Sequence, residues 1–165
     1  DPDENTKLMA PFLEDRQMLQ NRLKTGLGVL RDEKEVDASR VAATGYCFGG
    51  LCVLDLARTG EDFQGAASFH GLFNKPGNTD GNAIKDKVLA LHGWDDPMVP
   101  PTDVVALAEE LTAAGADWQI HGYGNTLHAF TNPDANAPDM GAMYQVDADR
   151  RSWKAMESFL AEVLA

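Results

Sequence analysis

Besides a shorter pattern that follows Gly50, apolar side chains recur at helical spacing in three stretches of the chain. The first runs from about Pro11 to Arg31, the second lies between Pro101 and Gly115, and the third is the C-terminal segment. Apolar positions three and four residues apart lie on one face of a helix, so each stretch predicts an amphipathic helix. Pro11 suits the first turn of the first helix, where its missing amide hydrogen is no loss. The predicted apolar face of the C-terminal helix consists of Trp153, Met156, Leu160, Val163 and Leu164.

Four short apolar runs between these helices predict buried strands. They are Val41–Thr44, Gly65–Phe69, Val88–His92 and Trp118–Gly122. Residues 74–82, rich in Gly and Asn, predict an exposed loop, and residues 131–141 predict a second loop. Strands that alternate with helices pair in parallel through right-handed crossovers, which predicts an α/β sheet with helices on both faces. In such sheets functional groups gather at the carboxyl ends of the strands.

The segment Gly45–Gly50, with the sequence GYCFGG, joins the first predicted strand to an apolar helical pattern. A turn this tight forces its central residue, Cys47, into a strained backbone conformation. Gly45 and Gly49 flank Cys47, and we expect these two glycines to let the strand and the helix approach closely. The segment therefore has the pattern of a nucleophile elbow with cysteine in the place of serine.

Composition and charge narrow the class of protein. The 165 residues, 44% of them hydrophobic, suffice for one sizeable core and predict one domain or a piece of one. The formal net charge of -12 disfavours nucleic acid as a partner, because no basic cluster is present to contact phosphates. No apolar run approaches the roughly 20 residues of a membrane span, and the first residues do not resemble a signal peptide. Two neighbouring cysteines, Cys47 and Cys52, do not form a disulfide framework and indicate a reducing compartment, hence a cytoplasmic protein.

Candidate catalytic side chains follow three of the predicted strands. Cys47 follows the first, the pair Asp95 and Asp96 follows the third, and His128 comes shortly after the fourth. The order nucleophile, carboxylate, histidine is that of the α/β-hydrolase arrangement. There the histidine takes the proton of the nucleophile, and the carboxylate orients the histidine and stabilises its charged form. On the residues alone, either aspartate can fill the last role.

Three motifs in this order resemble the dienelactone hydrolases, a family of α/β-hydrolases with a cysteine nucleophile. They are Gly45–Gly50, Asp96–Pro100 and His128–Phe130. The resemblance extends over essentially the whole chain and implies that Cys47 is the nucleophile, His128 the base and Asp96 the carboxylate. It also implies that the backbone amide of Phe48 contributes to the oxyanion hole. The implied activity is cleavage of small esters or lactones through a thioester, with phosphotriester cleavage as a side activity.

The chain departs from the family pattern in two ways. Family members carry additional strands ahead of the matching part, so residues 1–165 resemble the C-terminal part of a single α/β-hydrolase domain without its N-terminal strands. We therefore expect a complementary N-terminal segment, from another piece of chain or another subunit, to pair with the first predicted strand and supply a second oxyanion donor. The dienelactone-cleaving enzymes have an arginine four residues after the histidine, where this chain has Asn132. A neutral amide does not replace that cation, so we expect a neutral or different ester as substrate.

Other residues near the predicted site have more than one interpretation. His70, Trp94 and Asn132 are candidate substrate-binding residues. His92 is expected to hydrogen-bond locally at the end of its strand. Cys52 is expected to pack in the core, without a disulfide to Cys47.

Two further interpretations concern partners and cofactors. The C-terminal apolar stripe with Trp153 and Phe159 predicts core packing first and a homodimer face second. Neither an HExxH pattern nor a phosphate-binding glycine motif occurs, so no metal or cofactor is expected. The alternative to an enzyme is a hydrolase remnant that binds a small ligand or a partner without turnover, because only half of the oxyanion hole is present.

Overall fold

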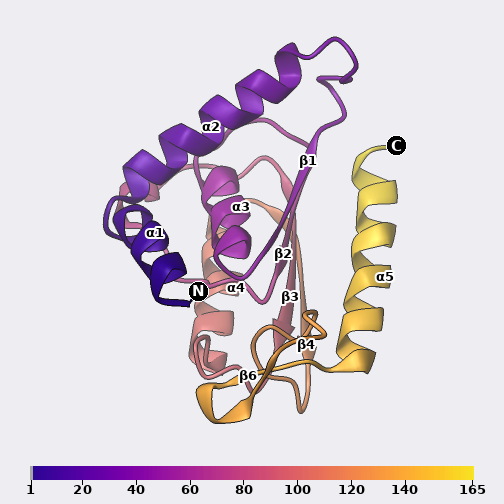
Figure 1. Cartoon of the computed structure of the whole chain (residues 1–165). Helices are drawn as coiled ribbons and strands as arrows, with labels where there is room; N and C mark the ends of the chain where they lie inside the picture. The colour runs from indigo at the N-terminus through magenta and orange to yellow at the C-terminus, as the bar shows by residue number, and fades with distance from the viewer. Residues whose placement is uncertain (1) are drawn as a thin grey trace.

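Four parallel strands form the main sheet within residues 2–165, the part of the chain that the computed structural model describes (Figure 1). The strands are β1 (Ala42–Tyr46), β2 (Gly65–Phe69), β3 (Lys87–Gly93) and β4 (Asp117–Tyr123), and they lie in the order β1-β2-β3-β4. The register aligns Ala43 with Ala66, Ala66 with Val88, and Val88 with Trp118. Each predicted strand is present, and strands that are consecutive in the chain are neighbours in the sheet.

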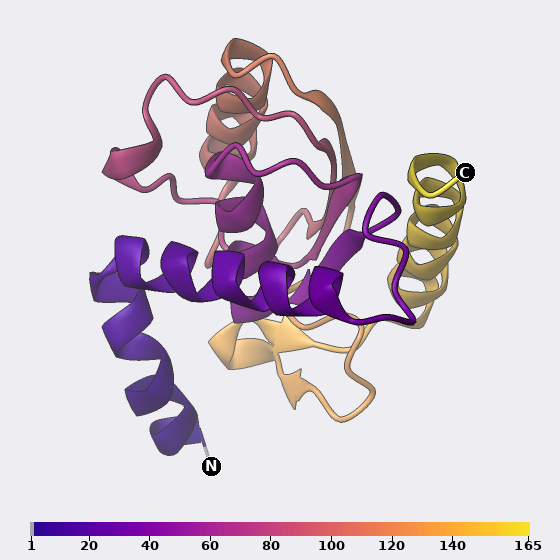
Figure 2. The ribbon, with the colours of Figure 1, turned by 90° about the horizontal axis from the view of Figure 1, so that it is seen from above.

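Helices cover both faces of this sheet, as predicted. They are α1 (Pro2–Glu14), α2 (Arg16–Asp32), α3 (Phe48–Arg58), α4 (Pro101–Ala113) and α5 (Val146–Val163). Figure 2 shows α5 by itself on one side of the sheet, and α2, α3 and α4 on the other. Within residues 2–165, none of the helices is both long and apolar enough to cross a membrane.

The central strands divide the core into two layers. Every residue of β2 is buried, and so are all residues of β3 except Lys87. Successive side chains of a strand point to opposite faces. Ala66 and Val88 therefore pack in the cluster with α3 and α4, whereas Ala67 and Leu89 pack in the cluster with α5. Burial on both faces explains why these strands are continuous apolar runs in the sequence.

The N-terminal helical region differs from the prediction of one helix beginning near Pro11. Pro11 lies inside α1, and the helical backbone is interrupted at Asp15 before α2 begins. The Asp15 side chain accepts the backbone N–H of Met18 at 2.9 Å, so Asp15 is the N-cap of α2. The polar cap, and not the proline, marks the start of the long helix.

The face that α5 buries is rotated relative to the predicted stripe. Its buried residues are Ala148, Ser152, Met156 and Phe159. Leu160 and Val163 pack against the same cluster, but Trp153 is 50% exposed. The interpretation of Trp153 as a core residue is therefore wrong, while that of Phe159 is confirmed.

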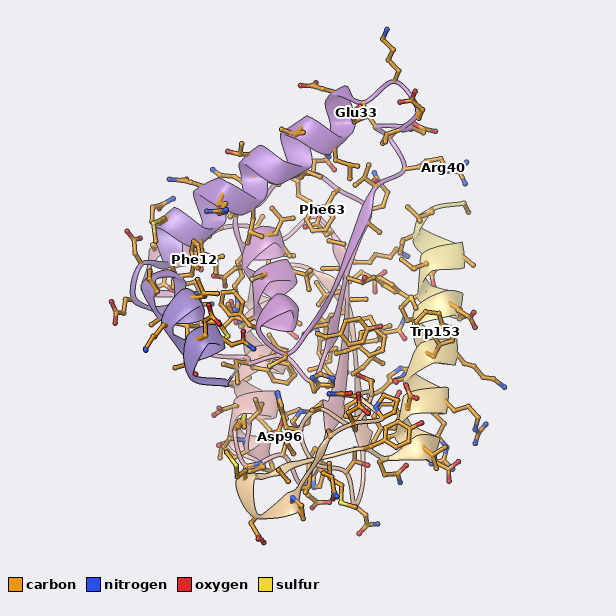
Figure 3. The ribbon with its side chains drawn as sticks, viewed as in Figure 1. Phe12, Glu33, Arg40, Phe63, Asp96 and Trp153 are labelled. Carbon is orange, nitrogen blue, oxygen red and sulfur yellow. The ribbon has the colours of Figure 1, made fainter. Side chains whose placement is uncertain are left out.

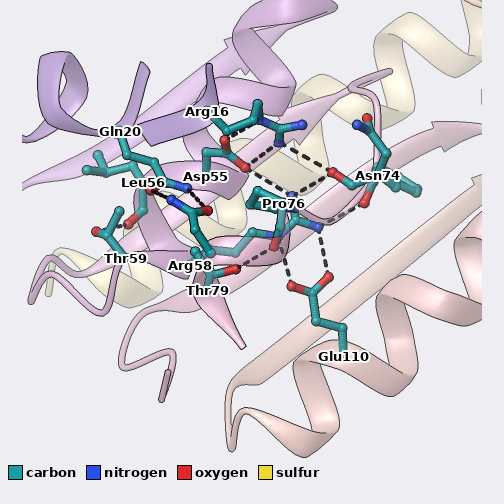
Figure 4. Close-up of polar contacts among 12 residues, drawn as sticks. Arg16, Gln20, Asp55, Leu56, Arg58, Thr59, Asn74, Pro76, Thr79 and Glu110 are labelled. Carbon is teal, nitrogen blue, oxygen red and sulfur yellow. Dashed lines mark hydrogen bonds and ion pairs between the residues drawn. The ribbon is translucent and has the colours of Figure 1, made fainter. Parts of the chain in front are cut away.

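A buried ion network joins α2, α3 and α4 (Figure 4). The carboxylate of Asp55 in α3 accepts hydrogen bonds from Arg16 of α2 at 2.5 and 2.6 Å. Arg58, one turn further along α3, donates to Glu110 of α4 at 2.8 and 2.9 Å and is only 2% exposed. Because removal of one partner would leave a buried charge unpaired, this network fixes how the three helices pack.

Two predicted loops contain more structure than expected. Residues 74–82 include the 3-10 turn η1 (Gly77–Thr79), and Pro76 and Thr79 are buried, so this loop is only partly exposed. The second loop contains β5 (Asn136–Ala137) and the turn η2 (Pro138–Met140), and β5 pairs antiparallel with β6 (Ala142–Met143). This small hairpin lies directly before α5.

Candidate active site

Cys47 lies at the turn between β1 and α3, with φ of 53° and ψ of -119°. Few residues that carry a Cβ adopt such a positive φ, so the turn is strained as the elbow pattern predicts. A Cβ on Gly45 would lie 2.0 Å from the carbonyl oxygen of Gly49, and a Cβ on Gly50 would lie 2.7 Å from the Cα of Gly71. A Cβ on Gly49 would meet nothing within 4 Å. The steric role expected of Gly49 is therefore wrong, and Gly50 has that role together with Gly45.

Three side chains from different strand ends form a continuous row. Sγ of Cys47 lies 3.2 Å from Nε2 of His128, and Nδ1 of His128 lies 2.7 Å from Oδ2 of Asp96. The other carboxylate oxygen of Asp96 accepts the backbone N–H of Met98 at 2.9 Å. Asp96, labelled near the carboxyl ends of the strands in Figure 3, is 2% exposed and His128 is 4% exposed, whereas Cys47 is open to solvent. The row has the geometry of a nucleophile, a base and an orienting carboxylate.

The two neighbouring aspartates have different surroundings. Asp96 is buried against His128, but Asp95 is exposed and accepts the backbone N–H of Thr126 at 3.2 Å. This bond ties the loop after β3 to the loop after β4. The geometry therefore brings Asp96, and not Asp95, to His128.

The electrostatics of the row favour transfer of the thiol proton to His128. The hydrogen bond with His128 lowers the pKa of the Cys47 thiol, burial opposes this, and the His128 charge and the Phe48 backbone N–H lower the pKa further. Burial by itself would lower the pKa of His128, but its hydrogen bonds with Asp96 and Cys47, together with their charges, raise it to about 9. Both shifts act in the same direction and favour a thiolate beside an imidazolium over a neutral thiol beside a neutral imidazole.

The backbone amide of Phe48 lies at the start of α3. Its N–H hydrogen-bonds the Cys47 sulfur, and this contact is one of the causes that lower the pKa of Cys47. Backbone N–H groups in the first turn of a helix are free to bind anions. Phe48 is therefore positioned to donate to an oxyanion that forms next to the sulfur.

His70 contacts both the candidate nucleophile and the candidate base. It follows β2 with a positive φ of 37° and is 3% exposed. Nδ1 of His70 accepts the backbone N–H of Cys47 at 3.2 Å, and Nε2 lies 2.9 Å from Oγ1 of Thr131. The imidazole rings of His70 and His128 meet edge-on, with their centroids 5.0 Å apart. Burial lowers the pKa of His70 to about 4, with a further contribution from the charge of His128, so the ring is neutral.

A cavity of about 590 Å³ opens beside Cys47. It is lined by Tyr46, Cys47, His70, Ala129, Thr131, Asn132, Pro133, Asp149 and Trp153. His70 and Asn132, two of the candidate substrate-binding residues, therefore face the cavity. Trp94 does not line it, because its ring covers Gly122 of β4.

Sequence reasoning missed two cavity residues on α5. Asp149 and Trp153 both line the cavity, and Trp153 is labelled on α5 in Figure 3. Residues four apart lie on the same face of a helix, so the spacing of these two was a usable signal. The apolar pattern outweighed it, because a tryptophan among leucines and methionines is typical of a core face.

Two buried groups near the site take no part in the row. Cys52 of α3 is partly buried and free, and burial, with the charge of Asp55, raises its pKa to about 11. His92 is fully buried and neither ring nitrogen has a hydrogen-bond partner within residues 2–165, so the expected local hydrogen bond is wrong. Its ring packs on Phe73, with centroids 5.3 Å apart. Among the described residues, no three His, Cys, Asp or Glu side chains are placed to hold a metal ion.

Comparison with known sequences relates nearly the whole chain to one family. The model of the Dienelactone hydrolase family matches residues 1–164. The uncharacterized protein K02A2.1 of Caenorhabditis elegans is 35% identical over 150 residues, which cover 89% of this chain and 95% of that protein. A putative carboxymethylenebutenolidase of Saccharolobus solfataricus is 26% identical over 168 residues, or 98% of this chain. The match spans only 60% of that relative and 47% of a similar protein of Salmonella typhimurium.

Solved structures agree with this relationship. A dienelactone hydrolase-like promiscuous phosphotriesterase from metagenomic libraries superposes with a TM-score of 0.89 at 35% identity, over 97% of this chain and 67% of that one. The fold is shared more widely: SOBER1 of Arabidopsis thaliana has a TM-score of 0.65 at 18% identity, over 92% of this chain and 67% of that one. The chain thus has an α/β-hydrolase fold.

Proposed function

Because the chain belongs to the dienelactone hydrolase family, whose members are hydrolases, we propose that it cleaves small neutral esters or lactones with Cys47, His128 and Asp96 as a catalytic triad. The observation that carries the proposal is the unbroken row from Cys47 Sγ to Asp96 Oδ2, with separations of 3.2 and 2.7 Å. A thiolate next to an imidazolium is a strong nucleophile with its proton donor already in place.

The first half of the reaction acylates the enzyme. The Cys47 thiolate attacks the carbonyl carbon, and the N–H of Phe48 donates to the oxyanion that results. When the tetrahedral intermediate collapses, the bond to the leaving oxygen breaks, and that oxygen takes the proton from Nε2 of His128. The products are an alcohol and a thioester on Cys47. For a lactone, both remain in one molecule.

The second half releases the acid. His128, now neutral, removes a proton from a water molecule that attacks the thioester carbon. Collapse of the second tetrahedral intermediate expels the Cys47 sulfur as a thiolate and restores the thiolate–imidazolium pair. Asp96 orients His128 through its hydrogen bond to Nδ1 and stabilises the charged form of His128.

The cavity supports a neutral substrate over an anionic one. Among the described residues that line it, none is a lysine or an arginine, whereas Asp149 contributes a carboxylate. Asn132 lies on the cavity wall with its side-chain oxygen accepting the N–H of Asp134 at 3.0 Å. A carboxylate on the substrate would find no charged partner on this wall and would face Asp149.

Phosphotriesters are a proposed second substrate class. The support is the likeness to a structure described as a promiscuous phosphotriesterase, at 35% identity. In that reaction the Cys47 thiolate would displace an alkoxide or aryloxide from phosphorus, and water would then cleave the sulfur–phosphorus bond. His128 would transfer its proton to the oxygen of the leaving group, as in ester cleavage.

The edge strand β1 supports the proposal of a complementary segment. Within the described residues β1 pairs only with β2, and Thr44 and Tyr46 are exposed on it. A further strand on this edge would bury both residues and would bring backbone amides next to the elbow. We propose that such a segment, in the same or another chain, supplies the second oxyanion donor.

Hydrolysis of p-nitrophenyl acetate tests the proposed function. Cys47→Ala should abolish turnover above the uncatalysed rate. During turnover by the protein without substitutions, mass spectrometry should detect an acetyl group on Cys47. Cys52→Ala is the matched control and should keep the activity, because Cys52 lies outside the row.

Full activity in Cys47→Ala would refute the proposed nucleophile. Absence of turnover in the unmodified protein, in the presence of its complementary segment, would favour a ligand-binding module without catalysis.

A further inference from the structure

His70 joins the two loops that carry the proposed nucleophile and the proposed base. The N–H of Cys47 is shared between the carbonyl of Phe69 at 3.0 Å and Nδ1 of His70 at 3.2 Å. On the opposite side of the ring, Nε2 lies 2.9 Å from Oγ1 of Thr131, three residues after His128. The imidazole of His70 thus spans the gap between the elbow and the loop of the base.

These contacts leave one protonation state for His70. A backbone N–H can only donate, so Nδ1 must be the unprotonated nitrogen that accepts it. The ring hydrogen is then on Nε2, which donates to the hydroxyl of Thr131. A second proton on Nδ1 would point at the Cys47 N–H and break that bond.

The packing around the ring also requires the neutral form. The ring is 3% exposed and lies edge-on to His128 and Phe130, with centroid distances of 5.0 and 5.1 Å. When His128 carries the proton of a thiolate–imidazolium pair, a charged His70 would place two cations in contact. His70 also has a positive φ of 37°, a backbone conformation that costs energy for a histidine. A residue that only fills space in the core would not need this backbone conformation, which directs the ring between the two loops.

We propose that His70 is a positioning residue that holds Cys47 and His128 at their working separation by bridging the amide of Cys47 and the hydroxyl of Thr131. The proposal rests on the proposed function, because His70 would position two members of the catalytic triad of that function. Without the bridge, the elbow and the base loop are free to separate, and the Sγ to Nε2 contact of 3.2 Å weakens. The thiolate is then less favoured at neutral pH.

Two amide variants separate the elbow contact from simple packing. The oxygen of asparagine is as many bonds from Cβ as Nδ1 of histidine, so His70→Asn keeps an acceptor for the Cys47 amide. The nitrogen of glutamine is as many bonds from Cβ as Nε2, so His70→Gln keeps only the donor to Thr131. Both variants remove the ring, but asparagine tolerates the positive φ of His70 better than glutamine does. Urea unfolding of both variants is therefore measured as well, and a merely structural role predicts that the alkylation rates follow the stabilities.

Alkylation of Cys47 by iodoacetamide, followed by mass spectrometry between pH 5 and pH 10, measures the thiolate directly. His70→Asn should stay within about threefold of the unmodified protein at pH 7, whereas His70→Gln should react about tenfold more slowly, the effect of one lost hydrogen bond. The profile of His70→Gln should also shift to higher pH.

A second pair of variants leaves the His70 ring in place. Thr131→Val removes the hydroxyl partner of Nε2 and should slow alkylation at pH 7 about threefold, because the ring loses one of two anchors. Thr59→Val makes the same chemical change at the end of α3, where Oγ1 donates to Leu56, and should leave the alkylation profile unchanged.

The proposal is overturned if His70→Asn and His70→Gln react at equal rates, or if Thr131→Val matches Thr59→Val. Because alkylation does not require ester turnover, the proposed function and the positioning role of His70 can be refuted independently of each other. The expected alkylation pattern without esterase activity would contradict the proposed function and support the bridge. Esterase activity that depends on Cys47, without the alkylation pattern, would overturn the role of His70 alone.

Discussion

At the scale of single residues, the site depends on where one proton resides. The pKa of Cys47 is lowered from the usual thiol value, and that of His128 is raised to about 9. Each shift has the other residue among its causes, and Asp96 adds to the shift of His128. The neutral His70 beside them adds no competing charge. Both shifts favour an ion pair between Cys47 and His128, of which His128 is buried and Cys47 is exposed.

The pH dependence of Cys47 reactivity follows from the direction of these shifts. Because the thiol pKa is lowered, thiolate is present above that lowered value and is lost only as the pH falls through it. The alkylation rate of Cys47 should therefore stay high at pH 7. In His128→Ala the rate should already decrease once the pH drops below about 8.5, near the ordinary pKa of a thiol. Stopped-flow alkylation across the pH range measures both profiles, with His121→Ala as the matched control. Superimposable profiles for the unmodified protein and His128→Ala would contradict the ion pair.

The two neighbouring aspartates give a matched test of the carboxylate. Asp96→Asn should lower kcat for p-nitrophenyl acetate by about 100-fold or more, because an amide does not stabilise the imidazolium and favours the wrong tautomer. Asp95→Asn should keep most of the activity, since Asp95 is bound to the Thr126 amide at 3.2 Å and does not contact His128. Equal losses of kcat in the two variants would show that activity depends on the conformation of the loop and not on the charge of Asp96.

At the scale of elements, the turns after the strands position the site. The elbow after β1, the turn after β3 and the loop after β4 lie at one edge of the sheet, since parallel strands end on the same side. Two side-chain contacts link loops at this edge: Asp95 of the turn after β3 binds Thr126 after β4, and His70 after β2 binds Thr131 after β4. The small hairpin of β5 and β6 continues this link, because the N–H of His128 donates to Gly141 at 2.9 Å.

The glycines of the elbow differ in how much they matter. A Cβ on Gly45 would lie 2.0 Å from the Gly49 carbonyl oxygen, so Gly45→Ala should lower the free energy of unfolding by about 3 kcal/mol or more. Gly49→Ala should be neutral or stabilising by up to about 1 kcal/mol, because its Cβ meets open space and alanine favours a helix. Urea unfolding of both variants measures the difference. A tolerated Gly45→Ala would mean that the elbow can open without loss of the fold.

At the scale of the whole molecule, the site lies at an open edge. Cys47 follows β1, which is an edge strand within residues 2–165, and the cavity opens toward Tyr46 and Trp153, both of which are partly exposed. Exposed strand edges tend to pair with another strand. The completeness of the oxyanion hole and the shape of the cavity therefore depend on what covers this edge.

Amide hydrogen exchange reports directly on the free edge of β1. The N–H of Cys47 donates to Phe69 of β2, so by the alternation of parallel pairing the N–H groups of Thr44 and Tyr46 point away from β2. In residues 1–165 alone, these two amides should exchange much faster than those of β2. Protection of Thr44 and Tyr46 after addition of a complementary segment would identify the paired edge. Slow exchange in the isolated chain would instead indicate that a second copy covers the edge.

Much of the fold and the order of the candidate site residues could be predicted from the sequence. Strands and helices depend on periodicity and on neighbours along the chain, so residues 65–69 were predicted as a strand with the bounds of β2. The break at Asp15 was missed because a long apolar stripe hides a local polar cap. The apolar neighbours of Trp153 predict a core position, although Trp153 is 50% exposed and lines the cavity.

The sequence by itself determined the alternation of strands and helices, the strained turn at Cys47, and the chain order of Cys47, Asp96 and His128. These features depend on local sterics and on topology, which short segments encode. Only the tertiary structure decided that His70 bridges the elbow and the base loop, that Gly50 and not Gly49 needs to be small, and that Asp149 lines the cavity. Those features depend on distances between elements, which are set by register and packing across the whole sheet.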